Sequence, residues 1–237
     1  MAAAPISNFV LRVAEHFERE LGQSLVECYK LGSLAHGGYS EIYSDIDVGL
    51  VLKCRQPPAE MSEWIAHVKL LDPGYGNKLS VFWGDPESAW GRLPMIDRLD
   101  LLDHGIPLLR GTKPSFRRPT KGEIHQEQLQ SIDRSWKARL PELSRLTSLE
   151  AKDCKPYIRA VLYAARLIYP WDNLVVDSND VAVAYLHRIK PPGLDLKSMD
   201  RALACRKGEC NAEDVFALRT DLNRQCENAI RYISANT

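Results

Sequence analysis

The sequence predicts a two-domain α/β protein, in which a first domain with a small mixed sheet is followed by an α-helical bundle. Strand-type and helix-type patterns are mixed only before about residue 111. Residues 112–119 are polar and contain two prolines, and every later pattern is helical. We therefore expect the first domain to span residues 1–117 and the helical domain to span residues 118–237.

The first domain is predicted from runs of apolar residues with either helical spacing or near-continuous β-type character. Its patterns predict, in order, a helix over 8–21, strands over 25–31 and 46–52, a helix over 59–71, a turn over 72–77, a strand over 78–83, a helix over 94–104 and a short strand over 106–109.

The second domain shows apolar positions only at helical spacing. Tyr157, Val161, Ala164, Ala165 and Ile168 form one apolar face. Ser178 is suited to cap a helix that continues to Leu186, and residues 212–233 predict one closing helix. This half is expected to be a helical bundle.

Composition excludes several classes of protein. The 31 basic and 31 acidic side chains balance, which argues against a general nucleic-acid or anionic-membrane binder. No apolar run is long enough to span a bilayer, and the first residues lack the features of a signal peptide, so a cytoplasmic protein is expected. The six cysteines contain no CxxC pair, which favours reduced, mostly buried thiols over a zinc site.

One segment combines residue types that carry chemistry. Gly32 and Ser33 lie where the first predicted strand ends, and eleven residues separate them from Asp45 and Asp47. Residues two apart in a strand project from the same face, so the two carboxylates are expected to converge on one site. Mg²⁺ is the expected cation, because it binds hard oxygen ligands from one or two carboxylates together with substrate phosphates.

Each part of this pattern also has a purely structural interpretation. A Gly-Ser pair is common in turns, and an isolated Asp-x-Asp is usually a solvated strand edge or a helix cap. Asp47, however, is followed directly by an apolar strand, where an unpaired buried carboxylate would be costly. The combination therefore favours a phosphate-binding turn beside a metal-binding pair.

The segment Leu31-Gly32-Ser33, with Asp45-Ile-Asp47-Val48 after the spacer, resembles the nucleotidyltransferase superfamily with the polymerase-β-like fold. Residues 157–169 and 175–182 are similar to the helical domain of aminoglycoside adenylyltransferases of the streptomycin/spectinomycin type, and residues 100–111 to the end of their first domain. The resemblance covers most of the chain, strongly in two patches.

This resemblance implies transfer of AMP from ATP to a hydroxyl, with the site in a cleft between the domains. It implies that Asp45 and Asp47 hold Mg²⁺ and act in catalysis, and that the nucleotide is contacted by Gly32, Ser33, Ser44 and Arg166. ATP, Mg²⁺ and a hydroxyl-bearing acceptor, such as an aminoglycoside-like small molecule, are the expected ligands.

The sequence departs from this family where a third carboxylate is expected on a neighbouring strand. The matching position holds Ser80. Asp85 is the nearest acid and the candidate replacement, although strand alternation puts it on the other face from Ser80 unless the register shifts or a bulge intervenes.

A second departure is Asn179, where the aminoglycoside enzymes carry a lysine. The candidate substitutes for the lost charge are Lys53, Arg110, Lys113, Lys155 and Arg159. Glu150 and Asp153, the acidic residues considered for a cationic acceptor, are interleaved with Lys152 and Lys155, which argues against an antibiotic acceptor.

Three hypotheses follow. The first is a Mg²⁺-dependent adenylyltransferase, and the second is a catalytically impaired nucleotide-binding or interaction protein of the same fold. The third is a nucleotidyltransferase whose acceptor is a protein or an RNA, although zero net charge argues against RNA. His36 is expected to face solvent, and the five tryptophans are expected to pack rather than stack on adenine.

Overall fold

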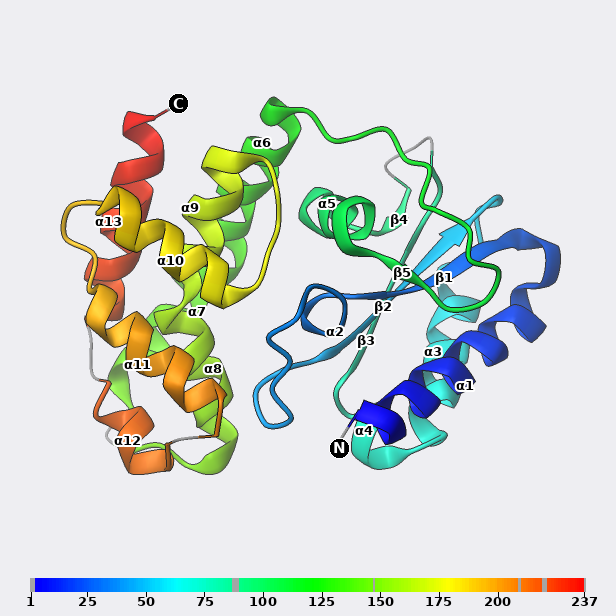
Figure 1. Ribbon diagram of the computed structural model, residues 1–237, viewed down its shortest axis with the longest axis horizontal. Coiled ribbons are helices and arrows are strands. Elements are labelled where there is room, and N and C mark those ends of the chain that lie inside the picture. The colour runs from blue at the N-terminus through cyan, green and yellow to red at the C-terminus, as the bar shows by residue number, and fades with distance from the viewer. Residues whose placement is uncertain (1–2, 87–89, 147, 209, 219–220, 237) are drawn as a thin grey trace. The chain divides into compact units, whose positions relative to one another are not determined.

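The computed structural model describes residues 3–86, 90–146, 148–208, 210–218 and 221–236, and Figure 1 shows their course. The chain forms two compact units. Unit 1 comprises Met1–Tyr39 and Ser44–Pro119, and unit 2 comprises Ser40–Tyr43 and Thr120–Thr237. Among the described residues, no helix has the length and apolar character needed to cross a membrane.

Unit 1 is built on a five-stranded mixed sheet of order β4-β3-β2-β1-β5. The strands are β1 (Leu25–Leu31), β2 (Ile46–Leu52), β3 (Leu79–Gly84), β4 (Gly91–Arg92) and β5 (Ile106–Pro107). β1 is antiparallel to both β2 and β5, β2 is parallel to β3, and β3 is antiparallel to β4. The sequence therefore predicts the ends of β1 and β2 as observed and the ends of β3 to within one residue.

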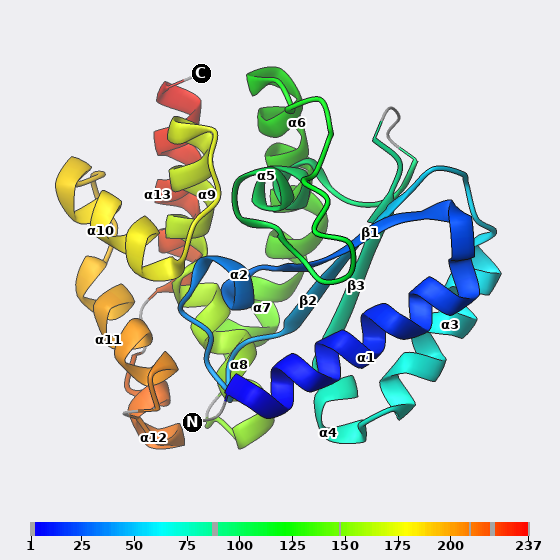
Figure 2. The same cartoon turned by 45° about the vertical axis from the view of Figure 1, so that its right-hand side comes forward.

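Helices cover both faces of this sheet (Figures 1 and 2). The helical segments of unit 1 are α1 (Ala3–Leu21), η1 (Gly22–Ser24), α2 (Ser33–His36), α3 (Pro58–Leu70), α4 (Pro73–Gly76) and α5 (Met95–His104). α1 and α3 pack on one face, where Val48, Leu50 and Val81 join their core. Leu31, Val51 and Leu101 of α5 form a separate cluster on the other face.

Strand alternation decides which face each site residue occupies. In β2 the even-numbered residues from Ile46 to Leu52 point into the α1–α3 core, so Asp47 points to the face that carries α5. In β3, Val81 joins the α1–α3 core while Phe82 packs on the opposite cluster. Ser80 therefore shares the α5 face with Asp47.

Unit 2 is helical. Its segments are α6 (Lys121–Ser131), η2 (Ile132–Trp136), α7 (Lys137–Arg145), α8 (Ala151–Val161), α9 (Tyr163–Asn173), α10 (Asn179–Ile189), α11 (Leu196–Arg206), α12 (Ala212–Phe216) and α13 (Leu222–Ala235). The predicted Ser178 cap is confirmed, because its hydroxyl accepts the N–H of Val181 at 3.3 Å.

The prediction of one closing helix over residues 212–233 is wrong. Two helices occupy this range, since α12 ends at Phe216 and α13 begins at Leu222. The Asp221 carboxylate accepts the N–H of Arg224 at 3.0 Å and thus caps a new helix. The helical spacing of apolar residues continues from α12 to α13 and does not show that the helix ends. The capping residue Asp221 is the local sign that a second helix begins.

Four residues of the spacer between Ser33 and Asp45 belong to unit 2. Tyr43 is 5% exposed and lies in the core of unit 2 with Cys154, Tyr157 and Ile158. Ile42, its neighbour, is 63% exposed. The chain thus passes through the helical core immediately before it reaches the Asp45–Asp47 pair.

The expectation of reduced thiols is wrong for Cys205 and Cys210, which form a disulfide with a Cα–Cα distance of 4.6 Å. α11 ends at Arg206, and Gly208 follows with a φ of +85°, which lets the chain reverse direction. Cys210 therefore returns to Cys205 over a loop that no CxxC pattern reveals. Cys28, Cys154 and Cys226 are free and buried, as expected, while Cys54 is free and exposed.

Candidate functional site

The candidate site is centred on Gly32, which follows β1 and directly precedes the short α2. Its φ of +59° and ψ of −148° lie in a region that residues with a side chain rarely adopt. A Cβ at this position would collide with Oδ2 of Asp47. Glycine is therefore required both for the turn and for the close approach of the Asp47 carboxylate.

Pairing of the strands fixes the position of Asp47. Leu31 is its partner in antiparallel β1, so the turn that follows Leu31 lies beside the Asp47 carboxylate. Both Asp45 and Asp47 are half-buried, and Asp45 directly precedes β2. The N–H of Ile46, between them, donates to the carbonyl of Lys78 at 2.9 Å, which holds this stretch against the start of β3.

Ser33 and Ser44 flank this pair along the chain. Ser33 is the first residue of α2 and is half-buried, and Ser44 is 4% exposed. Ser44 separates Tyr43, in the core of unit 2, from Asp45. Within unit 1 the structure therefore brings Gly32 and Asp47 into contact and places Ser33 and Asp45 next to them in the chain.

Ser80 occupies the position where the family resemblance expects a third carboxylate. It pairs with Asp47 in the parallel β2–β3 ladder. Neighbouring strands lie about 4.8 Å apart, and the two side chains share one face. The position is thus geometrically suited to a third carboxylate, but it carries a neutral hydroxyl.

The structure does not bring Asp85 to this pair. β3 continues without a shift in register from Leu79 opposite Ile46 to Gly84 opposite Val51. Asp85 follows the end of this strand, five residues beyond Ser80, which corresponds to about 16 Å of extended chain. Neither the shifted register nor the bulge that could have replaced the third carboxylate is present.

Two candidate cations of unit 1, Lys53 and Arg110, also lie away from Asp47. Lys53 follows the far end of β2, and its N–H donates to the carbonyl of Ser24 at 2.8 Å. The guanidinium of Arg110 donates to Glu18 at 2.8 Å, an ion pair near the start of β1. These residues belong to the end of the sheet opposite Gly32.

In unit 2, Arg166 is an exposed residue of α9, and Asn179 is the first residue of α10 after the Ser178 cap. Glu150 and Asp153 form the capping box of α8, in which Asp153 accepts the N–H of Glu150 at 3.1 Å. The two acids considered for a cationic acceptor thus serve as helix caps.

Sequence reasoning missed Asp100. This α5 residue is 5% exposed, and its Oδ2 accepts the N–H of Gly32 at 2.6 Å. Burial raises the pKa of Asp100, and the hydrogen bond from Gly32 and the nearby His36 and His104 oppose that rise. An aspartate between Leu99 and Leu101, both fully buried, is the only local signal of this role.

His36 does not face solvent as expected. Its side chain is 9% exposed, and Nε2 lies 3.9 Å from Oδ1 of Asp100. Its Nδ1 lies 3.1 Å from the carbonyl oxygen of Gly37, and its ring meets that of His104 edge-on at 5.5 Å. The histidine is thus packed behind the turn.

The donor set of the pair fits Mg²⁺. Asp45 and Asp47 supply hard carboxylate oxygens, and the missing side chain of Gly32 leaves Oδ2 of Asp47 unobstructed by a Cβ. Within the described ranges, no group of three or more His, Cys, Asp or Glu residues could hold a metal ion. Two carboxylates suit an ion that takes its remaining ligands from phosphates and water.

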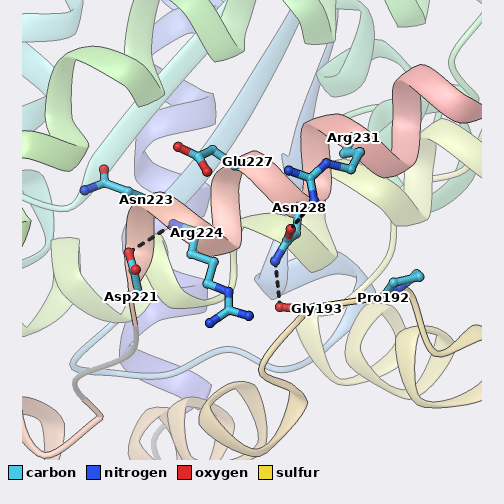
Figure 3. Close-up of a pocket in the computed structure, with 8 residues that line it drawn as sticks. All are labelled: Pro192, Gly193, Asp221, Asn223, Arg224, Glu227, Asn228 and Arg231. Carbon is cyan, nitrogen blue, oxygen red and sulfur yellow. Dashed lines mark hydrogen bonds between the residues drawn. The ribbon is translucent and has the colours of Figure 1, made fainter.

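A separate pocket of about 560 Å³ lies in unit 2 (Figure 3). It is lined by Pro192, Gly193, Asp221, Asn223, Arg224, Glu227, Asn228 and Arg231. Asn228 donates to the carbonyl of Gly193 at 2.8 Å and accepts from Arg231 at 3.3 Å. None of the site residues predicted from the sequence lines this pocket.

Comparison with known proteins supports the fold. No protein-family model matches the chain, and a search of curated proteins finds no match. The structural comparison shows that the chain shares its overall fold with a solved adenyltransferase. The solved structure concerned is spectinomycin adenyltransferase AAD(9) from Enterococcus faecialis, with ATP and spectinomycin. It matches with a TM-score of 0.67 and 13% sequence identity over 94% of this chain and 98% of that one.

Proposed function

We propose that this protein is a Mg²⁺-dependent nucleotidyltransferase that moves AMP from ATP to a hydroxyl group of an acceptor. The observation that carries the proposal is the contact between Gly32 and Asp47, which joins a glycine turn to a carboxylate pair. The nucleotidyltransferase fold and the structural neighbour solved with ATP support it.

In this proposal the residues of the chain bind and orient the reactants. Asp45 and Asp47 would hold Mg²⁺, which when bound stabilises negative charge on the phosphoryl group being transferred. Ser33 would donate its hydroxyl to the triphosphate, and Gly32 would let the phosphates approach the backbone. Arg166 of unit 2 and Ser44 would add nucleotide contacts, as the family resemblance implies.

Ser80 favours a second candidate, a protein that binds Mg²⁺ and ATP without efficient turnover. A general base commonly contributes about a hundred- to ten-thousandfold to a rate. The position opposite Asp47 offers a hydroxyl instead of a carboxylate. The same nucleotide site would then serve binding rather than transfer.

The test is transfer of label from α-labelled ATP to a panel of acceptors that includes spectinomycin, other hydroxylated small molecules, proteins and RNA. The double variant Asp45→Asn/Asp47→Asn should abolish transfer. Asp103→Asn is a matched control, because it removes an acid of the same unit that pairs with Arg118 at the surface. Equal labelling by the wild type and the double variant would refute the proposal.

Calorimetry with ATP and Mg²⁺ separates the two candidates. Mg²⁺-dependent binding that requires Asp45 and Asp47, with no transfer to any acceptor, would establish the binding protein. Transfer that depends on the same residues would establish the enzyme.

A further inference from the structure

Asp100 and Gly32 are joined by a short hydrogen bond between distant parts of unit 1. Oδ2 of the buried carboxylate accepts the Gly32 N–H at 2.6 Å, across 68 residues of sequence. Hydrogen bonds from an amide to a carboxylate are shorter and stronger than those between neutral groups. This bond therefore fixes the backbone nitrogen of the turn to α5.

Gly32 is held between two carboxylates. Asp100 accepts its N–H, and Oδ2 of Asp47 lies close enough to clash with an added Cβ. A displacement of Gly32 would change its approach to Asp47. Asp100 is thus placed to control the geometry of the proposed nucleotide site without being one of its metal ligands.

Within the ranges that the structure describes, the second carboxylate oxygen of Asp100, Oδ1, lacks the hydrogen bonds expected of a buried carboxylate that only stabilises the fold. Oδ1 is buried and has no hydrogen-bond partner in the described part of the chain, while Nε2 of His36 faces it at 3.9 Å. The carbonyl of Gly37, 3.1 Å from Nδ1 of His36, can only accept a hydrogen bond. Asp100 therefore binds the residue that precedes α2 and also lies beside His36, the last residue of α2.

Glu27 provides the contrast. It is fully buried in β1, and both of its oxygens accept backbone N–H groups, with donors Cys28, Leu109, Arg110 and Thr112 at 2.8 to 3.1 Å. Glu27 pairs with Val51, four residues beyond Asp47 along β2. It stabilises the opposite end of the sheet, and all of its contacts serve the fold.

A buried carboxylate with one unsatisfied oxygen costs stability, and an apolar residue in its place would not carry that cost. We propose that Asp100 is a positioning residue for nucleotide binding, which holds the Gly32–Ser33 turn against Asp47 so that the turn can receive the triphosphate. This inference rests on the proposed function, because it concerns the same nucleotide site.

The test compares Mg²⁺-dependent ATP binding by Asp100→Ala and Glu27→Ala. Both substitutions remove a buried carboxylate from unit 1 and leave backbone N–H groups without their acceptor, so both should lower the melting temperature. Binding is measured by calorimetry at a temperature where every variant is folded. Asp100→Ala should weaken ATP binding by about tenfold or more, as expected for the loss of a charge-assisted hydrogen bond, whereas Glu27→Ala should retain it.

Rescue by Asp100→Asn is the second measurement. The amide oxygen can still accept the Gly32 N–H, so ATP affinity should return to within about threefold of the wild type. Hydrogen exchange at the Gly32 amide, followed by NMR, should be fast in Asp100→Ala and slow in Asp100→Asn. A role limited to stability would give the same order of exchange rates but would leave ATP affinity unchanged in Asp100→Ala.

The outcomes separate the inference from the function. If the wild type and Asp100→Ala bind ATP equally, or if Glu27→Ala weakens binding as much, the positioning role is refuted and the proposed function stands. If the wild type shows no Mg²⁺-dependent ATP binding, the proposed function falls and the inference falls with it.

Discussion

Ser80 lies directly opposite Asp47 in the parallel pair of β2 and β3, and the two side chains share the face of the sheet that carries α5. A carboxylate at this position would be adjacent to Asp47 of the proposed metal-binding pair. The structure thus identifies one hydroxyl as the difference between the observed site and the three-carboxylate arrangement that the family resemblance implies.

Ser80→Glu should increase AMP transfer. A glutamate on this face can reach the space beside Asp47 and accept a proton from the attacking hydroxyl. We expect the rate to rise by about tenfold or more, measured with α-labelled ATP and whichever acceptor gives a signal with the wild type. Ser80→Gln, of equal size but without the charge, is the control, and equal rates for the two variants would exclude this role for the position.

Gly32→Ala should abolish nucleotide binding. The added Cβ would collide with the Asp47 carboxylate, and the φ of +59° adds backbone strain of about 1 to 3 kcal/mol. Gly22→Ala is the matched control, because Gly22 has a φ of +51° but no atom within 4 Å of an added Cβ. Denaturation should show destabilisation in both variants, and calorimetry should show loss of ATP binding only in Gly32→Ala. Normal binding by Gly32→Ala would contradict the assigned close approach.

Local patterns were sufficient for β1, β2 and β3, but they did not predict the short β4. The apolar run predicted β2 with its observed ends, and the two-residue repeat then puts Asp47 on the face opposite Val48 and Leu50. Strand alternation also predicts that Asp85 is on the opposite face from Ser80. The register of β3 is regular, so no bulge or shift moves Asp85 toward Asp47.

The remaining site features depend on contacts between residues far apart in the sequence. The partner of Asp100 is 68 residues away, so its hydrogen bond cannot be recognised from the helix in which it lies. In the spacer, Ile42 and Tyr43 are both apolar, yet only Tyr43 is buried. Tyr43 is buried because it packs into the helical core of unit 2, and no pattern within the spacer predicts that contact.

Tyr43→Ala should destabilise unit 2. The side chain lies in its core with Cys154 and Tyr157, and removal of a buried aromatic ring costs about 3 to 5 kcal/mol. Ile42→Ala, at the adjacent exposed position, should change the free energy of unfolding by no more than about 0.5 kcal/mol. Urea denaturation of both variants tests this contrast. Similar effects of the two substitutions would show that Tyr43 does not anchor the spacer.

His16 should make the folded state less stable in mild acid. It lies on α1 with Nε2 buried and, among the described residues, without a hydrogen-bond partner. Burial lowers the pKa of His16 below its usual value of 6.5, while the nearby Glu20 opposes this shift and Arg19 and His67 reinforce it. The unfolded chain therefore binds a proton at a higher pH than the folded protein does.

Stability should accordingly fall as the pH drops from about 6.5 through the lowered pKa of His16 in the folded protein, and this contribution should then level off. His16→Gln removes the titrating group at similar size. Urea denaturation at a series of pH values should give a constant difference in unfolding free energy between variant and wild type above pH 6.5, and a growing advantage for the variant below it. Curves that stay parallel from neutral to acid pH would show that the buried ring does not contribute to the acid sensitivity of the fold.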